Sequence, residues 1–553
     1  MKKIILILIT FLSLLNQTSY AQTPTWKWVS SILTSSSDQC NSMAVDVSGN
    51  SYITGYFIGS NLTIGTFILH NADPVNNTDD IFVAKYDSSG NVLWAKKFGS
   101  VGDEDGNAIA VDDSENVYIA GDYASHYLSF GTTTLTNTTN NSNTDVFFVK
   151  LDKNGNVIWA KSIGSTGLEF AKSIAIDTSG NVYLCGYFDS PTLNIGNDAL
   201  SNSGGDDIFL AKYDANGNVL WAKKAGGSNE DVALSMAVDP KENVYITGDF
   251  TSTSISFDTI NLTSTSTNGH ANLFIAKYDK SGNLILAKSA GCIGSTGWVQ
   301  ATTVGVDTSQ NMYVSGWFGY NNFNIGSSTL NYAGLYDIFF IKYDKNGNVI
   351  WAKGAGGSDV DQPYSITVDD DGNSYLGGSF QSSSITFGNI TLNNPGIFLT
   401  KYDPNGNVLW AKGDVGYNSS DNIISVKLSS SRNIYITGNF SDTTFILDNF
   451  TIQNPGEVGI FIAKSNISLN GINEIFKSNT VHIYPNPAKD NLTIETNSTK
   501  EQRLEIINLL GQTVYTSSIN KKAIVNTSAY PCGVYIIKLY TDKETAVKKF
   551  VKQ

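Results

Sequence analysis

The amino-acid sequence predicts an all-β fold: a seven-bladed β-propeller followed by a small Ig-like β-sandwich. Three observations support this fold class. First, the 553 residues include 27 tyrosines, 27 phenylalanines and 50 glycines, a composition that suits strands and tight turns better than helices. Second, one phrase recurs seven times, with spacings of 60 to 68 residues. Third, the phrase stops after residue 465, and a different set of short alternating strands follows.

The N-terminus has the pattern of an export signal. Two lysines precede a largely apolar stretch at residues 4–15, and Ser19 and Ala21 place small residues where a signal peptidase reads. We therefore expect residues 1–21 to be a signal peptide, cleaved between Ala21 and Gln22. An uncleaved membrane anchor is the alternative, but the apolar stretch is short for a membrane span.

Charge, hydropathy and cysteine usage exclude several classes of protein. The net charge is -14 and the mean hydropathy is -0.12, and residues 22–471 alone carry a charge of -20. This acidic body repels phosphate backbones, so nucleic acid is not an expected partner. No apolar run after the N-terminus reaches about 18 residues, so we expect no transmembrane segment in the mature chain. The cysteines, whose pairing stays open, lack the spacing of a disulfide framework or metal site: Cys40, Cys185, Cys292 and Cys532.

The recurring phrase is an Asp, a turn with Gly-Asn or a variant, a Tyr and then a Gly. Its tyrosines are Tyr52, Tyr118, Tyr183, Tyr245, Tyr313, Tyr375 and Tyr435. A second phrase alternates with the first and ends in Val-Leu-Trp-Ala-Lys or a variant. Its tryptophans are Trp28, Trp94, Trp159, Trp221, Trp351 and Trp410, and Leu286 takes that place in the remaining copy.

Each phrase predicts a β-hairpin. Apolar and polar residues alternate at period two, and the Asp-x-x-Gly-Asn between them is a tight-turn sequence. Two hairpins give four strands per copy, named a, b, c and d, which is typical of a propeller blade. Trp28 belongs to a d strand that precedes every a strand, and residues 461–464 form a c strand without a following d strand. We expect the N-terminal d strand to complete the last blade and close the ring.

These phrases resemble the SBBP family of bacterial β-propeller repeats. Gly-Asn-Val-Tyr-Ile-Thr-Gly-like and Lys-Tyr-Asp-x-x-Gly-Asn-Val-Leu-Trp-Ala-Lys phrases carry the resemblance over about residues 25–465. We place the propeller at residues 22–465. The resemblance implies the fold but little about activity, because propellers carry many functions.

The connections between strands predict where a ligand would bind. The a–b and c–d connections are tight turns on one face of the disc, the turn face. The d–a and b–c connections lie on the other, the loop face. Variable loops on a rigid scaffold usually carry the binding site. We therefore expect a ligand surface on the loop face, although its loops could also be solvated spacers. Four loop aromatics could stack on sugars or simply pack: Tyr127, Trp298, Tyr320 and Tyr332.

An acidic position recurs eight residues before the turn Asp of each copy. It is occupied by Asp38, Glu104, Glu169, Asp231, Asp361 and Asp421, with Val299 in the exceptional copy. It falls at the start of strand a, the innermost strand, so six carboxylates would surround the loop-face mouth of the central channel. One interpretation is a site for a cation such as calcium or for a cationic ligand. The favoured alternative is architectural: each carboxylate accepts backbone N–H bonds and fixes its own loop.

Catalytic patterns are scarce. The four histidines form no ligand-spaced pair, and the Asp-x-x-Gly-Asn turns lack the alternating acids and terminal Glu of a calcium-binding EF-hand. Paired carboxylates for glycoside chemistry remain possible among so many acids, but the sequence singles out no pair. We name no catalytic residue and no required cofactor.

The C-terminal residues form a separate module. Residues 466–479 are predicted to be a linker, and residues 480–553 contain short alternating strands typical of a small β-sandwich. They resemble the type A C-terminal sorting domain of the Bacteroidota type IX secretion system. The resemblance rests on Tyr484, Pro485, Asn486, Pro487, Gly511, Gly533, Tyr535 and Lys549. An Ig-like module of a binding protein is the alternative, and Cys532 is a minor departure from the family pattern.

The resemblance implies handling by the type IX machinery and passage through the periplasm and the outer membrane. The protein would then be secreted or displayed on the cell surface. We expect it to bind an extracellular glycan or protein without catalysis. A polysaccharide-active enzyme using loop-face carboxylates and a structural or adhesion protein are the two alternatives.

Overall fold

The computed structural model describes most of the chain in two compact units, divided between Ile467 and Ser468. The described residues are 23–34, 36–139, 143–266, 268–292, 296–413, 421–454, 458–466, 481–496, 501–508, 512–531, 533–540 and 545–553. The predicted signal peptide, its cleavage point at Ala21 and Gln22, and nearly all of the predicted linker lie outside them. The two units are described separately.

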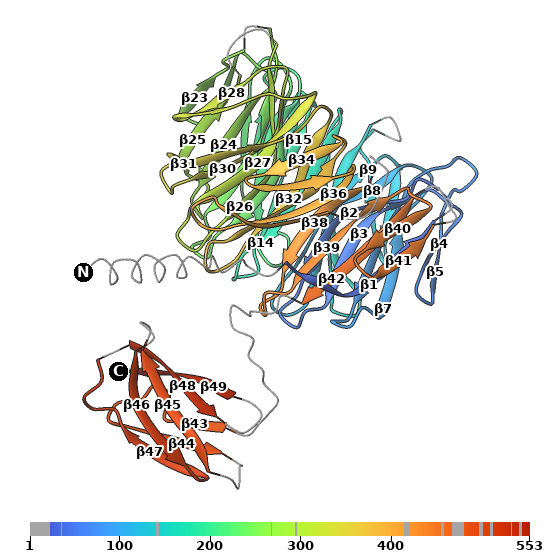
Figure 1. Cartoon of the computed structure of the whole chain (residues 1–553). Helices are drawn as coiled ribbons and strands as arrows, with labels where there is room; N and C mark the ends of the chain where they lie inside the picture. Colours follow the sequence, from blue (N-terminus) through green and yellow to red (C-terminus); the bar gives the residue numbers. More distant parts are fainter. Residues whose placement is uncertain are drawn as a thin grey trace. The chain divides into compact units, whose positions relative to one another are not determined.

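The first unit is built from seven antiparallel sheets that follow one another along the chain (Figure 1). Sheet 1 contains β2 (Gln39–Val45), β3 (Ser51–Phe57), β6 (Asp80–Tyr86) and β7 (Val92–Phe98). Sheet 2 contains β8 (Glu104–Val111), β9 (Val117–Tyr123), β12 (Asp145–Leu151) and β13 (Val157–Ile163). Sheet 3 contains β14 (Glu169–Ile176), β15 (Val182–Phe188), β18 (Asp207–Tyr213) and β19 (Val219–Gly226).

The remaining sheets repeat the same order of strands a, b, c and d. Sheet 4 contains β20 (Asp231–Val238), β21 (Val244–Phe250), β24 (Asn272–Tyr278) and β25 (Leu284–Ala290). Sheet 5 contains β26 (Trp298–Val306), β27 (Met312–Gly319), β30 (Tyr336–Tyr343) and β31 (Val349–Ala355). Sheet 6 contains β32 (Asp361–Val368), β33 (Ser374–Phe380), β36 (Gly396–Tyr402) and β37 (Val408–Gly413). Sheet 7 contains β38 (Asn422–Leu428), β39 (Ile434–Phe440), β42 (Gly459–Asn466) and β1 (Thr25–Leu33).

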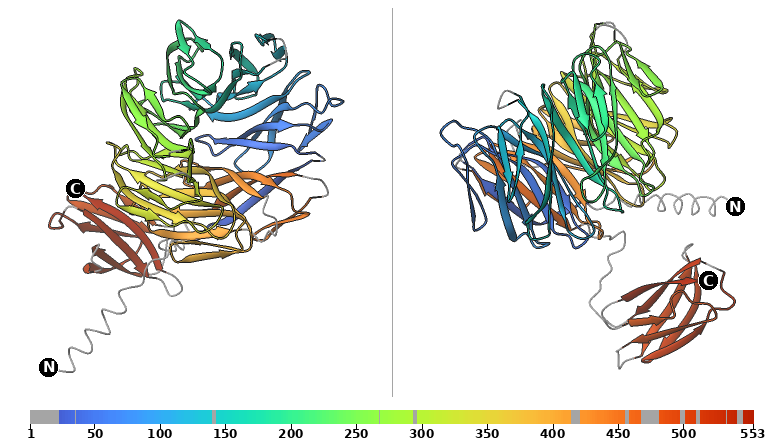
Figure 2. Two further views of the ribbon diagram at one scale, coloured as in Figure 1. Left: turned by 90° about the horizontal axis from the view of Figure 1, so that it is seen from above. Right: turned by 180° about the vertical axis from the view of Figure 1, so that it is seen from behind.

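The sheets form a closed ring, seen from above in Figure 2. Their a strands contact one another in sequence, and β2 contacts both β8 and β38. Strand β1 pairs with β42 from Thr25 opposite Asn466 to Leu33 opposite Gly459. The all-β class and the predicted closure by the N-terminal d strand are therefore confirmed.

The recurring Asp-x-x-Gly-Asn phrase forms the predicted tight turns. In the a–b turn of sheet 1, Asp46 Oδ1 accepts hydrogen bonds from the backbone N–H groups of Ser48 and Asn50, both at 2.9 Å. Its Oδ2 accepts from Asn50 Nδ2 at 2.8 Å and from the Tyr52 hydroxyl at 2.9 Å. Gly49 has φ +80°, which a glycine adopts without strain. Because four donors already occupy the Asp46 carboxylate, the phrase is explained by the turn itself.

Each a strand contains a β-bulge at the same point, where one residue has no partner on strand b. All seven bulged residues line one cavity of about 250 Å³ in the central channel. They are Asn41, Asn107, Lys172, Leu234, Thr302, Tyr364 and Ile424. The bulges therefore bring seven dissimilar side chains to the channel from seven similar strands.

Every b–c connection carries a short hairpin that the sequence analysis did not predict. Each hairpin contacts the d strand of its own sheet. The hairpins of sheets 1 to 4 and 6 also contact the d strand of the preceding sheet. In sheet 1, Leu62 and Ile64 of this hairpin are fully buried. The hairpins are β4 (Asn61–Ile64) and β5 (Phe67–His70), β10 (Tyr127–Phe130) and β11 (Thr133–Thr136), β16 (Thr192–Ile195) and β17 (Asp198–Ser201), β22 (Ser254–Phe257) and β23 (Ile260–Thr263), β28 (Phe323–Ile325) and β29 (Ser328–Leu330), β34 (Ser384–Phe387) and β35 (Ile390–Asn393), and β40 (Thr444–Leu447) and β41 (Phe450–Gln453). Much of each variable loop is therefore packed structure.

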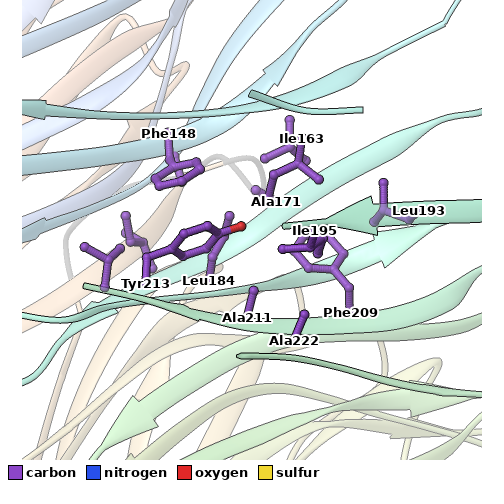
Figure 3. Close-up of a cluster of buried hydrophobic side chains, with 14 of the residues drawn as sticks. Phe148, Ile163, Ala171, Leu184, Leu193, Ile195, Phe209, Ala211, Tyr213 and Ala222 are labelled. Carbon is purple, nitrogen blue, oxygen red and sulfur yellow. The ribbon is translucent and has the colours of Figure 1, made fainter. Parts of the chain in front are cut away.

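The apolar faces of neighbouring sheets form the core. In the cluster of Figure 3, Phe148 of sheet 2 meets Tyr213 of sheet 3 with ring centroids 4.6 Å apart. Leu184 and Phe209 from the two middle strands of sheet 3 are fully buried in the same cluster. Successive side chains of a strand point to opposite faces of the sheet, and the middle strands, such as β3 and β6, are buried on both faces, so a sheet packs against two neighbours.

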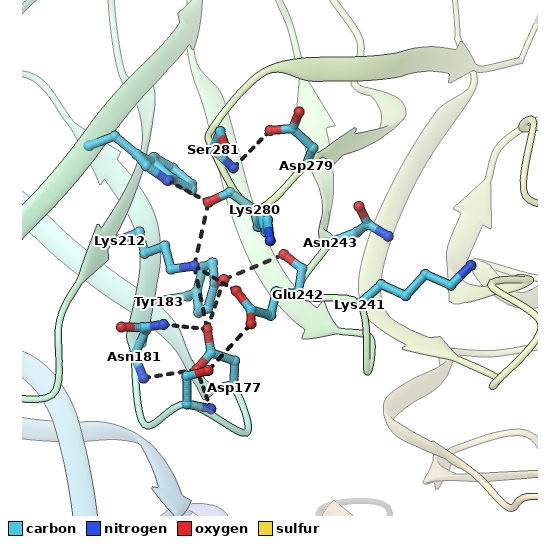
Figure 4. A network of polar contacts seen from close by, with 12 residues as sticks. Asp177, Asn181, Tyr183, Lys212, Lys241, Glu242, Asn243, Asp279, Lys280 and Ser281 are labelled. Carbon is cyan, nitrogen blue, oxygen red and sulfur yellow. Dashed lines mark hydrogen bonds and ion pairs between the residues drawn. The ribbon is translucent and has the colours of Figure 1, made fainter.

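A polar clamp joins each sheet to the next, as Figure 4 shows for sheets 3 and 4. The Lys212 Nζ lies 4.8 Å from the Tyr183 ring centroid and 3.4 Å from the carbonyl oxygen of Lys280 in the next c–d turn. Trp221 Nε1 donates to the same carbonyl at 3.2 Å. A Cβ at Gly282 of that turn would lie 2.9 Å from the Trp221 ring, so the glycine allows the close approach. The recurring Tyr, Lys and Trp are therefore explained by contacts between sheets.

The second unit is a β-sandwich. One sheet contains β43 (Val481–Tyr484), β44 (Asn491–Thr496) and β47 (Lys522–Asn526). The other contains β46 (Thr513–Ile519), β45 (Gln502–Asn508), β48 (Gly533–Tyr540) and β49 (Thr545–Lys552). Leu492, Ile494 and Ile537 are among the fully buried residues of their common core. This unit agrees with the predicted small sandwich.

Candidate ligand-binding surface

The structure places the six predicted acidic residues at the start of strand a, with none of them exposed. Their side chains are at most 1% exposed. Each accepts hydrogen bonds from the loop-face connections around it. Asp38 accepts from the backbone N–H of Ile58 at 2.8 Å, and Asp421 accepts from that of Ser441 at 2.9 Å. These donors begin the b–c connection of the same sheet.

The d–a connections supply the other donors. Ser100 N–H donates to Glu104 at 2.8 Å, and Ser165 N–H donates to Glu169 at 3.0 Å. Asp361 accepts from Gly357 N–H at 2.8 Å. The acids thus tie the d–a and b–c loops to the inner strand, as the architectural alternative requires. Val299, in the exceptional sheet, is also fully buried but has no carboxylate.

Hydroxyl groups complete the environment of three acids. Ser252 and Ser382 donate from their hydroxyls to Asp231 and Asp361 at 2.9 and 2.8 Å, and Ser190 donates to Glu169. Burial raises the pKa of Glu104 to about 8 and those of Glu169 and Asp231 to about 7. Among the residues that the structure describes, no group of three or more His, Cys, Asp or Glu side chains is arranged to hold a metal ion. Calcium binding stays a prediction.

The residue after the acidic position is not constant: it is Gln in sheets 1, 5 and 6, and Asp, Phe, Val or Asn in the other four. Together with its cross-strand partner on strand b, it forms what we call a channel-mouth pair, because the bulge that lines the channel follows two residues later. The pairs are Gln39–Tyr56, Asp105–Asp122, Phe170–Tyr187, Val232–Asp249, Gln300–Trp317, Gln362–Ser379 and Asn422–Asn439. The chemistry of the sheets therefore varies at the residue that follows the repeated acid, because the repeated contacts of the scaffold do not fix the side chain there.

An aromatic cluster forms on the loop face of sheet 5. Trp317 and Tyr336 have ring centroids 4.3 Å apart, and Tyr320 lies 5.8 Å from Tyr336 in a T-shaped arrangement. Tyr332 lies 6.5 Å from Tyr320. Tyr320 is 47% exposed and has φ +61°, which is unusual for a bulky residue. Leu335, 45% exposed, adds apolar area in the same connection. We call Trp317, Tyr320, Tyr332 and Tyr336 the sheet 5 aromatic cluster.

Polar groups adjoin this cluster. The Trp317 Nε1 donates to Gln300 Oε1 at 3.1 Å, and Gln300 Nε2 donates to Asp249 of sheet 4 at 2.9 Å. Burial raises the pKa of Asp249 to about 7, and the nearby acids Asp231 and Glu230 add to that rise. A partly exposed aromatic cluster, with Tyr320 as its exposed ring, therefore lies beside a fixed amide, a combination suited to a ligand with both apolar and hydroxyl surfaces.

The other two predicted aromatics, Tyr127 and Trp298, contact other residues and not the sheet 5 aromatic cluster. Tyr127, 54% exposed, is on hairpin strand β10 and contacts His126 at 4.0 Å between ring centroids. Trp298 contacts His270 at 4.9 Å. The structure brings Tyr320 and Tyr332 together, as the sequence could not show, and adds Trp317 and Tyr336. Trp317 and Tyr336 could not be told apart from core residues in the sequence, because they lie within strands β27 and β30, where apolar side chains recur.

Sheet 2 has a pair of acids that breaks the repeat. Asp105 and Asp122 face each other across strands β8 and β9. Burial raises their pKa values to about 6 and about 7, and repulsion from Asp105 adds to the rise at Asp122, whereas Lys172 of sheet 3 lowers both. Asn107 donates to Asp122 at 2.5 Å. Asp105 and Asp122 thus form a facing pair of carboxyl groups that the sequence could not single out.

The turn face has a cavity of about 350 Å³ between sheets 2 and 3. Two of its acids, Asp112 and Asp177, accept N–H groups of their own turns: Asn116 at 2.9 Å and Asn181 at 2.9 Å. Lys150 reaches the carbonyl oxygen of Ala215 at 3.4 Å. Asp112, Asp177 and Lys150 thus belong to the turns and to the clamp between sheets.

The predicted sorting residues lie on the C-terminal sandwich where they are described. Asn486 accepts from Val551 N–H at 2.9 Å, and Pro485 and Pro487 flank it. The Tyr484 hydroxyl donates to Glu495 at 2.6 Å, and the Tyr535 hydroxyl donates to the Pro531 carbonyl at 2.9 Å. Gly533 begins β48, and Lys549 is opposite Ile536 in the pairing of β48 with β49. Gly511 and Cys532 lie outside the described residues.

Comparison with known families identifies two modules. The secretion system C-terminal sorting domain matches residues 482–553, and the beta-propeller repeat matches residues 33–62 and 350–379. The chain therefore carries SBBP propeller repeats and a type IX C-terminal sorting domain, and it is a secreted or cell-surface propeller protein. Among the described residues, no helix is long and apolar enough to span a membrane.

Individual relatives are more distant. A WD repeat-containing protein of Acanthamoeba polyphaga mimivirus is 26% identical over 463 residues, covering 68% of this chain and 33% of that protein. An ulvan lyase of Nonlabens ulvanivorans is 24% identical over 216 residues, covering 37% of this chain and 38% of that protein. Of solved structures, Sqt1 from Chaetomium thermophilum has a TM-score of 0.37 at 9% identity, covering 76% of this chain and 82% of that one. The chain spans about a third of the length of the curated relatives named here.

Proposed function

We propose that this exported propeller binds a glycan through the sheet 5 aromatic cluster, without cleaving it. The observation that carries the proposal is the exposed Tyr320 among three further aromatic rings on the loop face. The C–H faces of a sugar ring pack against aromatic faces, while its hydroxyls need hydrogen-bonding partners beside them. The partly exposed amide of Gln300 is such a partner next to Trp317, and its bond to the buried Asp249 holds it in place. Export supports the proposal, because extracellular polymers are then within reach.

Affinity electrophoresis of the protein beginning at Gln22 tests the proposal, with a panel of polysaccharides cast into native gels. We expect one polymer class to retard the protein. Tyr320→Ala should weaken that binding by about tenfold, since one ring contact contributes about 1 kcal/mol. Tyr127→Ala is the matched control, because it removes a tyrosine of similar exposure from a different sheet. Equal weakening by the two variants, or retardation by no polymer, would refute the aromatic cluster as the site.

The alternative is a polysaccharide-active enzyme that uses the sheet 2 acid pair. Asp105 and Asp122, with pKa values of about 6 and 7, are suited to general acid–base chemistry near neutral pH. The similarity to an ulvan lyase is consistent with this alternative. Staining the same gels for polymer length distinguishes the two functions. Shortening that Asp122→Asn abolishes would establish the enzyme, whereas retardation without shortening supports binding.

A further inference from the structure

The central channel contains one lysine where the repeat has small residues. Two positions before the turn Asp, opposite the recurring Tyr, six sheets carry Ala44, Ala110, Ala175, Ala237, Gly305 and Thr367. Sheet 7 carries Lys427, opposite Tyr435. Lys427 lines the channel cavity of about 250 Å³. The repeat alone therefore does not account for this residue.

No described side chain balances the charge of Lys427. None of the ion pairs and hydrogen bonds found among the described residues involves its amine. Burial lowers its pKa, and no neighbouring carboxylate opposes that change. By contrast, the channel lysine Lys172 lies near Asp105 and Asp122. Lys427 is partly buried in the channel, and an ammonium group without a counter-ion in such surroundings destabilises a fold, so its presence needs a reason.

The same cavity is lined by hydroxyl groups with hydrogens to donate. One residue after each bulge, six sheets place Ser42, Ser173, Ser235, Thr303, Ser365 and Ser425 along the channel. Four of these oxygens accept backbone N–H bonds from the next sheet, as Ser365 does from Val426 at 3.0 Å. Among the described residues, none of the six has an acceptor for its own hydrogen. A hydroxyl carries one donor, and a lysine amine carries three.

We propose that the central channel binds a small tetrahedral oxyanion, such as sulfate or phosphate, between Lys427 and this ring of hydroxyls. Donors converge on the cavity from several sheets, and one of them is positively charged. Hydrogen bonds from an ammonium to an anion are the stronger, charge-assisted kind. The anion would supply the missing counter-charge at the axis of an otherwise acidic propeller and join sheet 7 to the rest of the ring.

Thermal unfolding of the whole mature chain tests the proposal. At matched ionic strength, millimolar sulfate or phosphate should raise Tm in a saturable way relative to chloride. Isothermal titration calorimetry should give one anion per chain. Lys427→Ala should weaken binding by about tenfold or more, and should raise Tm in chloride because the uncompensated charge is gone. Four other sheets carry Ala at this position, so the variant keeps a residue type that the fold accepts.

Lys27→Ala is the matched control, because it removes an exposed lysine from strand β1 of the same sheet. It should keep the full anion effect, which also corrects for the general stabilisation of proteins by sulfate. If Lys427→Ala does not fold, Lys427→Met takes its place, because it keeps a side chain of similar length without the amine. Three results would overturn the proposal. The anion effect could be absent from the natural protein, it could survive loss of the Lys427 amine, or Lys27→Ala could lower it equally.

Discussion

At the scale of single residues, the buried acids determine how stability depends on pH. Glu169 is fully buried, and burial raises its pKa from 4.5 to about 7. The folded protein therefore binds a proton between pH 4.5 and 7 that the unfolded chain has released. Stability is greatest below this interval and falls as pH rises through it. Glu104, Asp231 and Asp361, with pKa values of about 8, 7 and 6, act in the same direction.

We accordingly expect the propeller to unfold at a higher temperature at pH 5 than at pH 8. Glu169→Gln keeps one of the two acceptor oxygens and cannot ionise, so it should remove about 2 kcal/mol of this pH dependence. Denaturant unfolding at both pH values measures the effect. Asp113→Asn, at an exposed acid, is the control and should leave the slope unchanged. An unaltered pH slope in Glu169→Gln would show that its carboxyl group is ionised throughout.

The sequence predicts some residue roles and conceals others for a physical reason. The six acids were located by their repetition, and their loop-fixing role was the favoured interpretation. The hydroxyl donors Ser190, Ser252 and Ser382 were not predicted, because they lie about 21 residues further along the chain. Lys427 was missed for the same kind of reason: a repeat analysis looks for what recurs, whereas this residue is a departure from the pattern.

At the scale of the structural element, the recurring Trp is a connector between sheets. Trp94 donates to the Lys153 carbonyl of the next sheet at 3.0 Å and packs against Tyr52 with ring centroids 6.3 Å apart. Sheet 4 lacks both contacts, because Leu286 replaces the Trp. The junction between sheets 4 and 5 therefore has one fewer clamp than the junctions with a Trp.

Trp94→Leu reproduces the sheet 4 residue in sheet 1 and should lower the free energy of unfolding by about 2–3 kcal/mol. The loss combines aromatic packing with a carbonyl left without its donor. Urea titration measures it. Leu93→Ala, at an adjacent residue that is 48% exposed, should cost less than about 1 kcal/mol. A Trp94→Leu variant as stable as Leu93→Ala would mean that the clamp contributes little.

The strand that closes the ring is a second element with a testable role. Without residues 22–34, strand β42 loses its partner and becomes an open sheet edge. We expect the truncated protein to self-associate and to lose its sharp thermal transition. Size-exclusion chromatography and near-ultraviolet circular dichroism measure both effects. Adding a synthetic peptide of residues 22–34 should restore the elution volume of the intact protein. A truncated chain with the elution volume and Tm of the intact protein would contradict this role for β1.

The sequence predicts the main strands well and the loop hairpins poorly. The blade strands alternate at period two over seven or eight residues and are bounded by recognisable turns. The hairpin strands are three or four residues long, as in Phe323–Ile325, and are rich in Ser, Thr and Asn. Their burial comes from contacts with the d strand of their own sheet and, in five sheets, with that of the preceding sheet, and no local pattern records these contacts. Part of the variable loop expected to face ligands is therefore folded onto the scaffold.

At the scale of the whole molecule, the two units have separate tasks. Residues 482–553 match a secretion system sorting domain, and the propeller carries the candidate ligand surface. Deleting residues 482–553 should leave the propeller folded but abolish its appearance outside the cell. Fractionation of the producing bacterium, with unfolding of the periplasmic protein as a check, measures this. An unchanged amount at the cell surface or in the medium would show that another signal directs export.

The pairing of β1 with β42 also determines how the propeller responds to mechanical load. Thr25 lies opposite Asn466, so the chain enters and leaves the ring at the same end of one antiparallel strand pair. A force applied between the two chain ends would separate this pair one hydrogen bond at a time, like a zipper. If the chain is held beyond Asn466, a force from a ligand bound at sheet 5 instead has to pass through the intervening sheets. Tension on a bound ligand therefore does not unzip the pairing of β1 with β42, which closes the ring.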